Sequence, residues 1–228
     1  MIDFGGKLIL LDIEGTVSPL AFVHEVMFPY AREHAAAWLG AHWGHEVIAQ
    51  LAQDADVTTF SNALTAEAAV HRLMDADSKV TGLKQLQGLI WEEGFRNGDL
   101  RSTLFEDVLP ALDHWRENSR EIRIYSSGSI HAQKLFFAHT ASGDLVSRFC
   151  GFYDTTTGSK KDAASYSAIT ADCGLPANEV LFVSDLVDEL NAAETAGMIT
   201  AHALRPGNKP VPACGHPSIA SFDEITLV

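Results

Sequence analysis

The sequence predicts an α/β fold, in which a doubly wound parallel sheet forms the core and an all-helical segment is inserted after the first strand. Short, continuous apolar runs alternate with segments of helical periodicity from about residue 101 onward, which is the pattern of a parallel sheet with crossover helices. Residues 21–98 have helical periodicity with almost no β-branched runs. At 228 residues and 46% hydrophobic, the chain can bury one core and a sizeable insertion.

The first apolar run, Lys7–Leu11, lies between a Gly-Gly pair and Asp12 and is typical of a strand buried on both faces. Similar runs predict later strands at Ile122–Tyr125, Glu179–Val183 and Met198–Ala203. Helical spacing predicts crossover helices in Leu104–Arg120 and Asp162–Cys173. This order of elements is typical of a Rossmann-like sheet.

The inserted segment predicts a separate helical cap. Its expected helices are Pro29–Leu39, His45–Ala55, Thr65–Ala76 and Leu83–Asn97. A Gly-Asp pair follows the last of them, so we expect a hinge near residues 98–104 that lets the cap act as a lid. We therefore assign residues 1–17 and 101–228 to the catalytic core and residues 18–100 to the cap.

Charge and cysteine content restrict the class of protein. A net charge of −14 argues against a surface for nucleic acid or an anionic membrane, because either partner needs a large basic face. No apolar stretch approaches the roughly 20 residues of a membrane span, and the N-terminus lacks the features of a signal peptide. The three cysteines form no C-x-x-C pair, which favours reduced thiols and a cytoplasmic protein.

Polar residues follow three of the predicted strands, where ligands of open parallel sheets bind. These segments are Asp12-Ile13-Glu14-Gly15-Thr16, Ser126-Ser127-Gly128-Ser129, and Ser184-Asp185 with Asp188-Glu189 shortly after. The sequence therefore predicts a site at the carboxyl edge of the sheet.

Carboxylates dominate two of these strand ends. Asp12 and Glu14 could serve as a nucleophile and an acid/base, with Gly15 allowing a sharp turn, or could be an acidic loop that caps a helix. Asp185 adds a second hard oxygen ligand, and Mg²⁺ is typically held by one or two carboxylates with phosphate and water. A magnesium site explains the three residues together.

Other residues could hold a phosphate. Ser126 and Ser127 offer a hydroxyl and backbone N–H groups at the start of a helix, although Ser/Gly clusters are also ordinary turns. A lysine would supply a point charge, and the sequence leaves Lys160 and Lys161 as alternatives. The pair His42 and His45 has a spacing that suits a metal, but no third ligand is evident.

The strand-end aspartate and serine, the later lysine and the second strand-end aspartate, in this order, resemble the haloacid dehalogenase superfamily. The segments DIEGTVSPLAFVHEVMFPYA, LQGLIWEEGFRNGDL, IYSSGSIHAQKLFF and VLFVSDLVDELNAAETAGM are similar to the acireductone synthases, the enolase-phosphatase family of methionine salvage. That family's DIEGTTTP is DIEGTVSP here, so Val17 replaces a threonine while the catalytic residues remain. Glu14 stands where most phosphatases of the superfamily have a second aspartate.

The resemblance implies a monomeric, Mg²⁺-dependent enzyme with one cation per subunit, acting on a small phosphorylated diketone. Its reaction would enolise 2,3-diketo-5-methylthiopentyl 1-phosphate and then remove phosphate through an aspartyl-phosphate intermediate. The implied catalytic residues are Asp12 and Glu14, the metal ligands Asp12, Glu14 and Asp185, and the substrate-binding residues Ser126, Ser127 and Lys160.

The base for enolisation stays open. Glu14, His24 and Glu25 are candidate bases, with Lys84 and Arg96 as candidate oxyanion partners. Candidates for a pocket that holds the methylthio tail are Phe22, Phe28, Trp91 and Phe95. Two rival functions remain, a phosphatase of the same superfamily for another small ester and a non-catalytic module that binds metal or phosphate.

Overall fold

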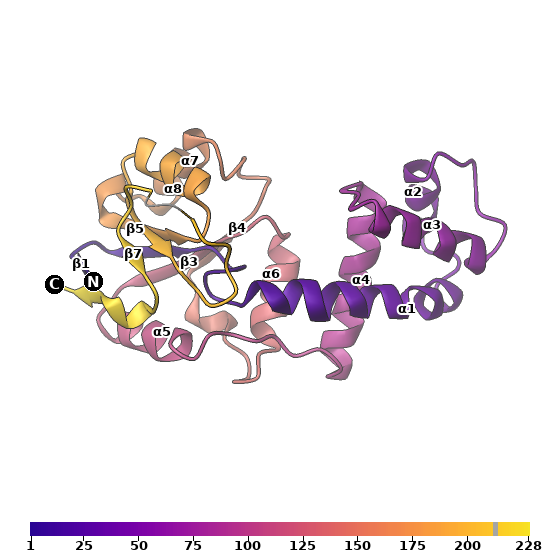
Figure 1. The fold of residues 1–228 in the computed structure, drawn as a ribbon, viewed down its shortest axis with the longest axis horizontal. Coiled ribbons are helices and arrows are strands. Elements are labelled where there is room, and N and C mark those ends of the chain that lie inside the picture. The colour runs from indigo at the N-terminus through magenta and orange to yellow at the C-terminus, as the bar shows by residue number, and fades with distance from the viewer. Residues whose placement is uncertain (212–213) are drawn as a thin grey trace. The chain divides into compact units, whose positions relative to one another are not determined.

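The computed structural model describes residues 1–211 and 214–228, and it confirms the predicted α/β fold with an inserted helical segment. Contacts divide the chain into two compact units, residues 1–22 with 101–228 and residues 23–100. Figure 1 shows the strands and helices of the first unit and the helices of the second. Each unit is described by itself below.

In the described part of the chain, six strands form the larger sheet in the order β4-β3-β2-β5-β6-β7, all parallel. The strands are β2 (Leu8–Leu11), β3 (Glu121–Tyr125), β4 (Gly151–Tyr153), β5 (Val180–Ser184), β6 (Ile199–Ala203) and β7 (Ser218–Ile219). A second, two-stranded sheet pairs β1 (Ile2–Phe4) with β8 (Ile225–Leu227). The four strands predicted from apolar runs are β2, β3, β5 and β6.

The short strands β4 and β7 escaped sequence reasoning because three and two residues are too few to show a period. The crossover helices are α5 (Val108–Glu117), α6 (Ile130–Ala138), α7 (Ala163–Cys173) and α8 (Val187–Thr195). One core cluster joins Leu10, Phe182, Tyr166 and Leu190, so α7 and α8 cover the same face of the sheet. Helix α5 lies on the opposite side of the sheet (Figure 1).

The order of the strands reverses between β2 and β5. From β2 the chain proceeds outward through β3 and β4, whereas β5 leads outward through β6 and β7 in the other direction. Leu11 of β2 lies opposite Val183 of β5 and Ile124 of β3. The residues that follow these strands therefore lie side by side at a topological switch point, where open α/β sheets bind ligands.

Two boundaries differ from the sequence expectation. The core keeps residues up to 22 instead of 17, because the Ser18 amide donates to Ile13 O (2.9 Å) and the Phe22 ring packs edge-on against Phe136 (5.9 Å). Helix α5 begins at Val108 instead of Leu104, because the Phe105 amide donates to Val17 O (3.1 Å). Tertiary contacts therefore override local periodicity at both places.

Residues 23–100, all of which the structure describes, form four α-helices: α1 (Phe28–Ala41), α2 (Glu46–Asp54), α3 (Ala63–Asp75) and α4 (Thr81–Asn97). A π-helical turn, Phe22–Met27, precedes α1. Helix α4 ends at Gly98, whose φ of 84° is a left-handed conformation that glycine adopts without strain. The hinge predicted at residues 98–104 stays a prediction.

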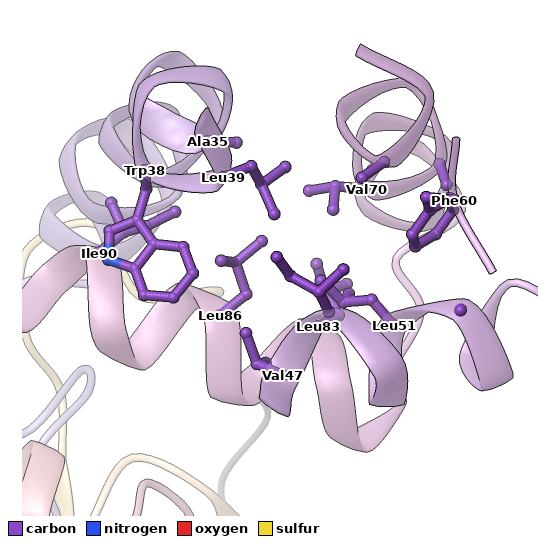
Figure 2. Close-up of a cluster of buried hydrophobic side chains, with 14 of the residues drawn as sticks. Ala35, Trp38, Leu39, Val47, Leu51, Phe60, Val70, Leu83, Leu86 and Ile90 are labelled. Carbon is purple, nitrogen blue, oxygen red and sulfur yellow. The ribbon is translucent and has the colours of Figure 1, made fainter. Parts of the chain in front are cut away.

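The helices of this unit enclose their own hydrophobic core (Figure 2). Trp38 and Leu39 of α1 pack with Leu51 of α2, Val70 of α3 and Leu86 of α4. His42 stacks on Trp38 (4.4 Å between ring centroids), and His45 caps α2 by accepting from the Val47 amide (3.2 Å). The two histidines therefore have structural roles at helix ends.

We expect Leu39→Ala to destabilise the helical unit by about 2–5 kcal/mol, because Leu39 is fully buried and its truncation leaves a cavity. Urea unfolding followed by tryptophan fluorescence measures the change. Leu64→Ala is the control, since Leu64 on α3 is 74% exposed and its truncation should change stability by no more than about 0.5 kcal/mol. Equal losses in the two variants would contradict this description of the core.

Candidate active site

Asp12 follows β2 directly and is 5% exposed. Its amide donates to Val183 O of β5 (3.0 Å), so the ladder of the sheet fixes the start of the loop. Its carboxylate accepts from Lys160 Nζ (2.5 Å) and more distantly from Thr16 Oγ1 (3.5 Å). The predicted nucleophile is thus held at the carboxyl edge of the sheet, with a cation against one oxygen.

The structure decides between the two lysines. Lys160 is 6% exposed, and its Nζ lies 2.5 Å from Asp12 Oδ1 and 2.5 Å from Glu189 Oε2. Lys161 instead forms an exposed ion pair with Asp188 (2.9 Å). Burial opposes the charge of Lys160, but the carboxylates of Asp12 and Glu189 outweigh it and raise the pKa of the ammonium. Lys160 is therefore a fixed positive charge beside Asp12.

The chain reaches this position through a tight approach at Gly158. A Cβ on Gly158 would lie 2.2 Å from Ser165 Oγ, and the φ of 142° is one that other residues rarely adopt. Tyr166 Oη donates to Lys160 O (2.7 Å) from within α7. The backbone on both sides of Lys160 is thereby anchored to the helix that follows.

Two acidic residues after β5 complete the charged cluster. Asp185 follows the last residue of the strand, and Glu189 in α8 accepts from Ser184 Oγ (2.9 Å) and Lys160. Burial and the neighbouring carboxylates of Asp12 and Glu189 raise the pKa of Asp185 to about 7. Burial also raises the pKa of Glu189, against the opposing effect of Lys160. Negative charge thus exceeds positive charge in this buried cluster.

Sequence reasoning noted Glu189 next to Asp188 but gave it no role. Glu189 is 5% exposed, whereas Asp188 lies on the surface. The signal that separates them is helical spacing within α8, because Glu189 lies three and four residues before the buried Ala192 and Ala193. Glu189 therefore lies on the buried face of the helix, where its carboxylate contacts Lys160.

Gly15 brings the loop after β2 against Asp185. Its φ is 71°, and a Cβ there would lie 2.6 Å from Asp185 Oδ2. The adjoining Glu14 is exposed, and its backbone forms an isolated β-bridge with that of Ser18. The sharp turn that the sequence predicted at Gly15 is present, and the catalytic role of Glu14 stays a prediction.

Ser126 and Ser127 follow β3 and occupy different environments. The buried Ser126 donates its amide to Tyr153 O (3.2 Å), while Ser127 is exposed. The Gln133 side-chain amide donates to Gly128 O (2.7 Å) and Tyr153 O (2.9 Å), which fixes this turn. Sequence reasoning did not single out Gln133, because a lone glutamine in a helix has no distinctive pattern.

A shallow depression of about 360 Å³ adjoins the cluster. It is lined by Ser127, Thr155, Gly158, Ser159, Lys160, Lys161 and Glu189. Asp154 next to it accepts from the Ile130 amide (3.0 Å) and Thr156 Oγ1 (2.6 Å). Although burial alone would raise the pKa of Asp154, these hydrogen bonds hold it below its ordinary value. Of the two lysines in this lining, Lys160 is buried beside Asp12, whereas Lys161 is exposed and paired with Asp188.

The donor set fits a magnesium ion. Asp12 and Asp185 are hard oxygen donors that follow neighbouring strands, and burial together with the nearby carboxylates of Asp12 and Glu189 raises the pKa of Asp185. The described residues contain no group of three His, Cys, Asp or Glu side chains spaced to bind one ion. A cation at these two carboxylates would therefore need further oxygens from the backbone, water or substrate, as Mg²⁺ commonly accepts.

Comparison with known proteins assigns the chain to a family. The sequence profile described as haloacid dehalogenase-like hydrolase matches residues 7–197, a range that contains Asp12, Lys160 and Asp185. The chain belongs to the haloacid dehalogenase-like hydrolase family. Magnesium dependence is typical of phosphatases in this family.

Curated relatives of this hydrolase match it over almost its whole length. Proteins named Enolase-phosphatase E1 from Aquifex aeolicus and Pseudomonas aeruginosa are 43% and 44% identical, over 97% of this chain and 99% and 98% of the relatives. The protein of the same name from Synechococcus elongatus is 45% identical over 95% of this chain and 96% of its own length. These matches confirm the resemblance drawn from sequence segments.

Solved structures give the same result for the fold. The Saccharomyces cerevisiae UTR4 protein is 34% identical to this hydrolase, with a TM-score of 0.83 over 96% of this chain and 100% of that one. The Rhodobacter sphaeroides protein CbbY, solved with phosphate, is 13% identical and has a TM-score of 0.66. The second likeness shows the fold alone. No helix among the residues described is long and apolar enough to cross a membrane.

Lys160→Met should lower kcat for an aryl phosphate by about 100- to 1,000-fold, because it removes the buried charge beside Asp12. The matched control is Lys161→Met, which removes an exposed pair and should change kcat by less than about threefold. Assays run below the melting temperature of each variant, because loss of a buried partner also destabilises the fold. Similar losses in both variants would contradict the assignment of Lys160.

Gly15→Ala should abolish most Mg²⁺-dependent activity. The new methyl group would meet Asp185 Oδ2 at 2.6 Å and would require a positive φ. Gly143→Ala is the control, because it carries the same kind of backbone strain (φ 91°) with no atom within 4 Å. Phosphate release and melting temperature measured together distinguish the two effects, and a Gly15→Ala protein as active as Gly143→Ala would contradict the close approach.

Proposed function

We propose that this hydrolase is the enolase-phosphatase of methionine salvage. Its reaction converts 2,3-diketo-5-methylthiopentyl 1-phosphate to 1,2-dihydroxy-3-keto-5-methylthiopentene and phosphate. The observation that supports it most is identity of 43–45% to proteins named Enolase-phosphatase E1 over 95–97% of the chain. The arrangement of Asp12, Lys160 and Asp185 supports phosphate chemistry.

Phosphate transfer begins at Asp12 in this proposal. An oxygen of Asp12 attacks phosphorus in line, the bond from phosphorus to the substrate oxygen breaks, and Glu14 gives a proton to the departing oxygen. Glu14 then removes a proton from water, which attacks the aspartyl phosphate at phosphorus and releases phosphate. Asp12 is regenerated, so atoms and charges balance over the two steps.

Lys160 has two roles in this scheme. Its ammonium holds Asp12 Oδ1 in place, and its charge offsets the negative charge brought by the phosphate. The hydroxyls of Ser126 and Ser127 would hold the phosphate oxygens, with Ser127 at the border of the depression. When bound by Asp12, Asp185 and the loop of Glu14, Mg²⁺ supplies further positive charge at the phosphate. Hydrolysis of phosphate monoesters needs such help, since it is among the slowest uncatalysed reactions.

Enolisation requires removal of a proton next to a carbonyl and stabilisation of the oxygen anion that forms. Glu14 remains a candidate for this base. The other candidate bases, His24 and Glu25, belong to the helical unit, and the assignment of the base stays open.

We also propose that the protein acts as a monomer in the cytoplasm on this small phosphorylated diketone, without a nucleic-acid or membrane partner. The free thiols of Cys150, Cys173 and Cys214 fit a reducing compartment.

Ultraviolet absorbance and free phosphate, followed together with the diketo phosphate and Mg²⁺, test the proposed function. We expect enediol absorbance and Mg²⁺-dependent phosphate release, with release lost in Asp12→Asn and on chelation of the metal. The Asp12→Asn protein also shows whether enolisation proceeds without the nucleophile.

Phosphate release confined to other esters would retain the phosphatase and discard the place in methionine salvage. Absence of release from the diketo phosphate and every ester tried would contradict the proposal altogether. Asp113→Asn serves as the control, because its carboxylate forms a partly exposed ion pair with Arg148 elsewhere in the core.

A further inference from the structure

A tight turn after β6 places two polar side chains against the loop that bears Asp12. Residues 205–208 have the sequence Arg-Pro-Gly-Asn, and the Asn208 amide donates to Arg205 O (3.1 Å). Proline at the second position and a φ of 88° at Gly207 are the signature of a type II turn. Both features restrict the backbone, so the side chains of Arg205 and Asn208 leave the turn in fixed directions.

The two side chains bind consecutive carbonyl groups of the loop after β2. Arg205 Nε donates to Thr16 O (2.9 Å), across 189 residues of sequence. Asn208 Nδ2 donates to Gly15 O (2.8 Å), across 193 residues. We call Arg205 and Asn208 the loop clasp. Together with the Phe105 amide, which holds Val17 O, the clasp fixes three successive carbonyls.

Arg205 is itself held firmly. Its Nη1 donates to Asp107 Oδ2 (2.8 Å) and to Ala220 O (2.9 Å). The guanidinium also packs against two aromatic rings, 4.8 Å from the centroid of Phe105 and 4.4 Å from that of Phe222. These contacts restrict the conformation of the Arg205 side chain. Its hydrogen bond to Thr16 O therefore fixes the loop relative to the surrounding core.

The clasp adjoins the charged cluster through Gly15. A Cβ on Gly15 would lie 2.6 Å from Asp185 Oδ2 and 3.0 Å from Asn208 Oδ1, so the Gly15 backbone is placed against both side chains. A shift of the Gly15 carbonyl would therefore move the loop relative to Asp185. Such a shift would alter the distance between the carboxylates of Asp12 and Asp185, and binding of a cation depends on that distance.

Two buried polar atoms of the clasp indicate a role beyond stability. Arg205 Nη2 and Asn208 Oδ1 have no hydrogen-bond partner among the residues that the structure describes. Unpaired buried polar atoms destabilise a protein, so each side chain carries a cost at one atom while its other atoms satisfy the loop carbonyls. The presence of both side chains is explained if their contacts with the loop carbonyls are themselves needed.

We propose that Arg205 and Asn208 are positioning residues that hold the Asp12–Thr16 loop in the conformation required to bind Mg²⁺ and present Asp12 for attack. They touch neither substrate nor metal and act through the Gly15 and Thr16 carbonyls. This inference rests on the proposed roles of Asp12 and Asp185. A purely structural arginine would lower stability alone, whereas the clasp should also change Mg²⁺ affinity.

The test uses Arg205→Lys and Asn208→Ala in the full-length protein. Lysine keeps the charge but cannot bind Thr16 O and Asp107 together, and alanine removes the contact to Gly15 O. The matched control is Arg123→Lys. Arg123 is a partly buried arginine on β3 that donates to Tyr153 Oη (2.6 Å) and to Asp172 (3.2 Å). Calorimetric titration gives the dissociation constant of Mg²⁺, aryl phosphate turnover gives kcat and KM, and thermal unfolding gives Tm.

We expect each clasp variant to bind Mg²⁺ about 10-fold more weakly and to lose about 10-fold in kcat at saturating Mg²⁺, with little change in KM. Arg123→Lys should lower Tm while leaving the dissociation constant and kcat near wild type. If Arg205→Lys does not fold, Asn208→Ala decides the matter, because Asn208 is only half-buried. Folded clasp variants with wild-type Mg²⁺ affinity and kcat, or equal losses in Arg123→Lys, would overturn the inference.

Asp12→Asn separates failure of the inference from failure of the proposed roles. If this variant retains turnover, or if the wild-type protein does not bind Mg²⁺, the proposed roles fail and the positioning inference is overturned with them. If Asp12→Asn is inactive and the wild type binds Mg²⁺ while the clasp variants match the control, only the positioning inference fails.

Discussion

The buried contact of Lys160 with Asp12 and Glu189 is the interaction on which the rest of the site depends. All three side chains are at most 7% exposed, and removal of charges from water is costly unless they are paired. The single ammonium of Lys160 contacts two carboxylates, and Asp185 adds a third acidic group whose pKa rises to about 7. The cluster is therefore incomplete electrostatically, which is the condition that favours binding of a divalent cation.

The sheet supplies the geometry of this cluster. Because β2 and β5 are adjacent and parallel, Asp12 and Asp185 emerge at the same edge, although β3, β4 and the helices α1 to α7 separate them along the chain. Lys160 arrives from the loop before α7, across 148 residues of sequence. A chain with a net charge of −14 repels anions as a whole, so attraction of a phosphate must be local. The buried lysine and a bound cation meet that requirement.

The loop after β2 is constrained from several directions, and this separates it from an ordinary surface turn. The sheet fixes Asp12 through its amide, Gly15 turns where a side chain would meet Asp185, and the loop clasp holds the next carbonyls. Preorganisation of this kind lets charged groups act without rearrangement during the reaction. The helical unit, by contrast, has its own core of buried side chains, which is consistent with a module that folds around separate contacts.

The sequence by itself determined the fold class, the four longer strands of the sheet and the acidic strand ends, because apolar periodicity and turn residues are local signals. Asp12, Asp185 and the Ser126-Ser127 turn were identifiable for that reason, and family resemblance added the substrate. The residues alone left Lys160 and Lys161 as alternatives, family resemblance favoured Lys160, and the tertiary structure places Lys160 against Asp12. Only the tertiary structure decided that Glu189 rather than Asp188 joins the cluster and that Arg205 and Asn208 hold the loop after β2. These choices depend on which of two adjacent side chains faces inward and on contacts across more than a hundred residues, and neither is encoded in local pattern.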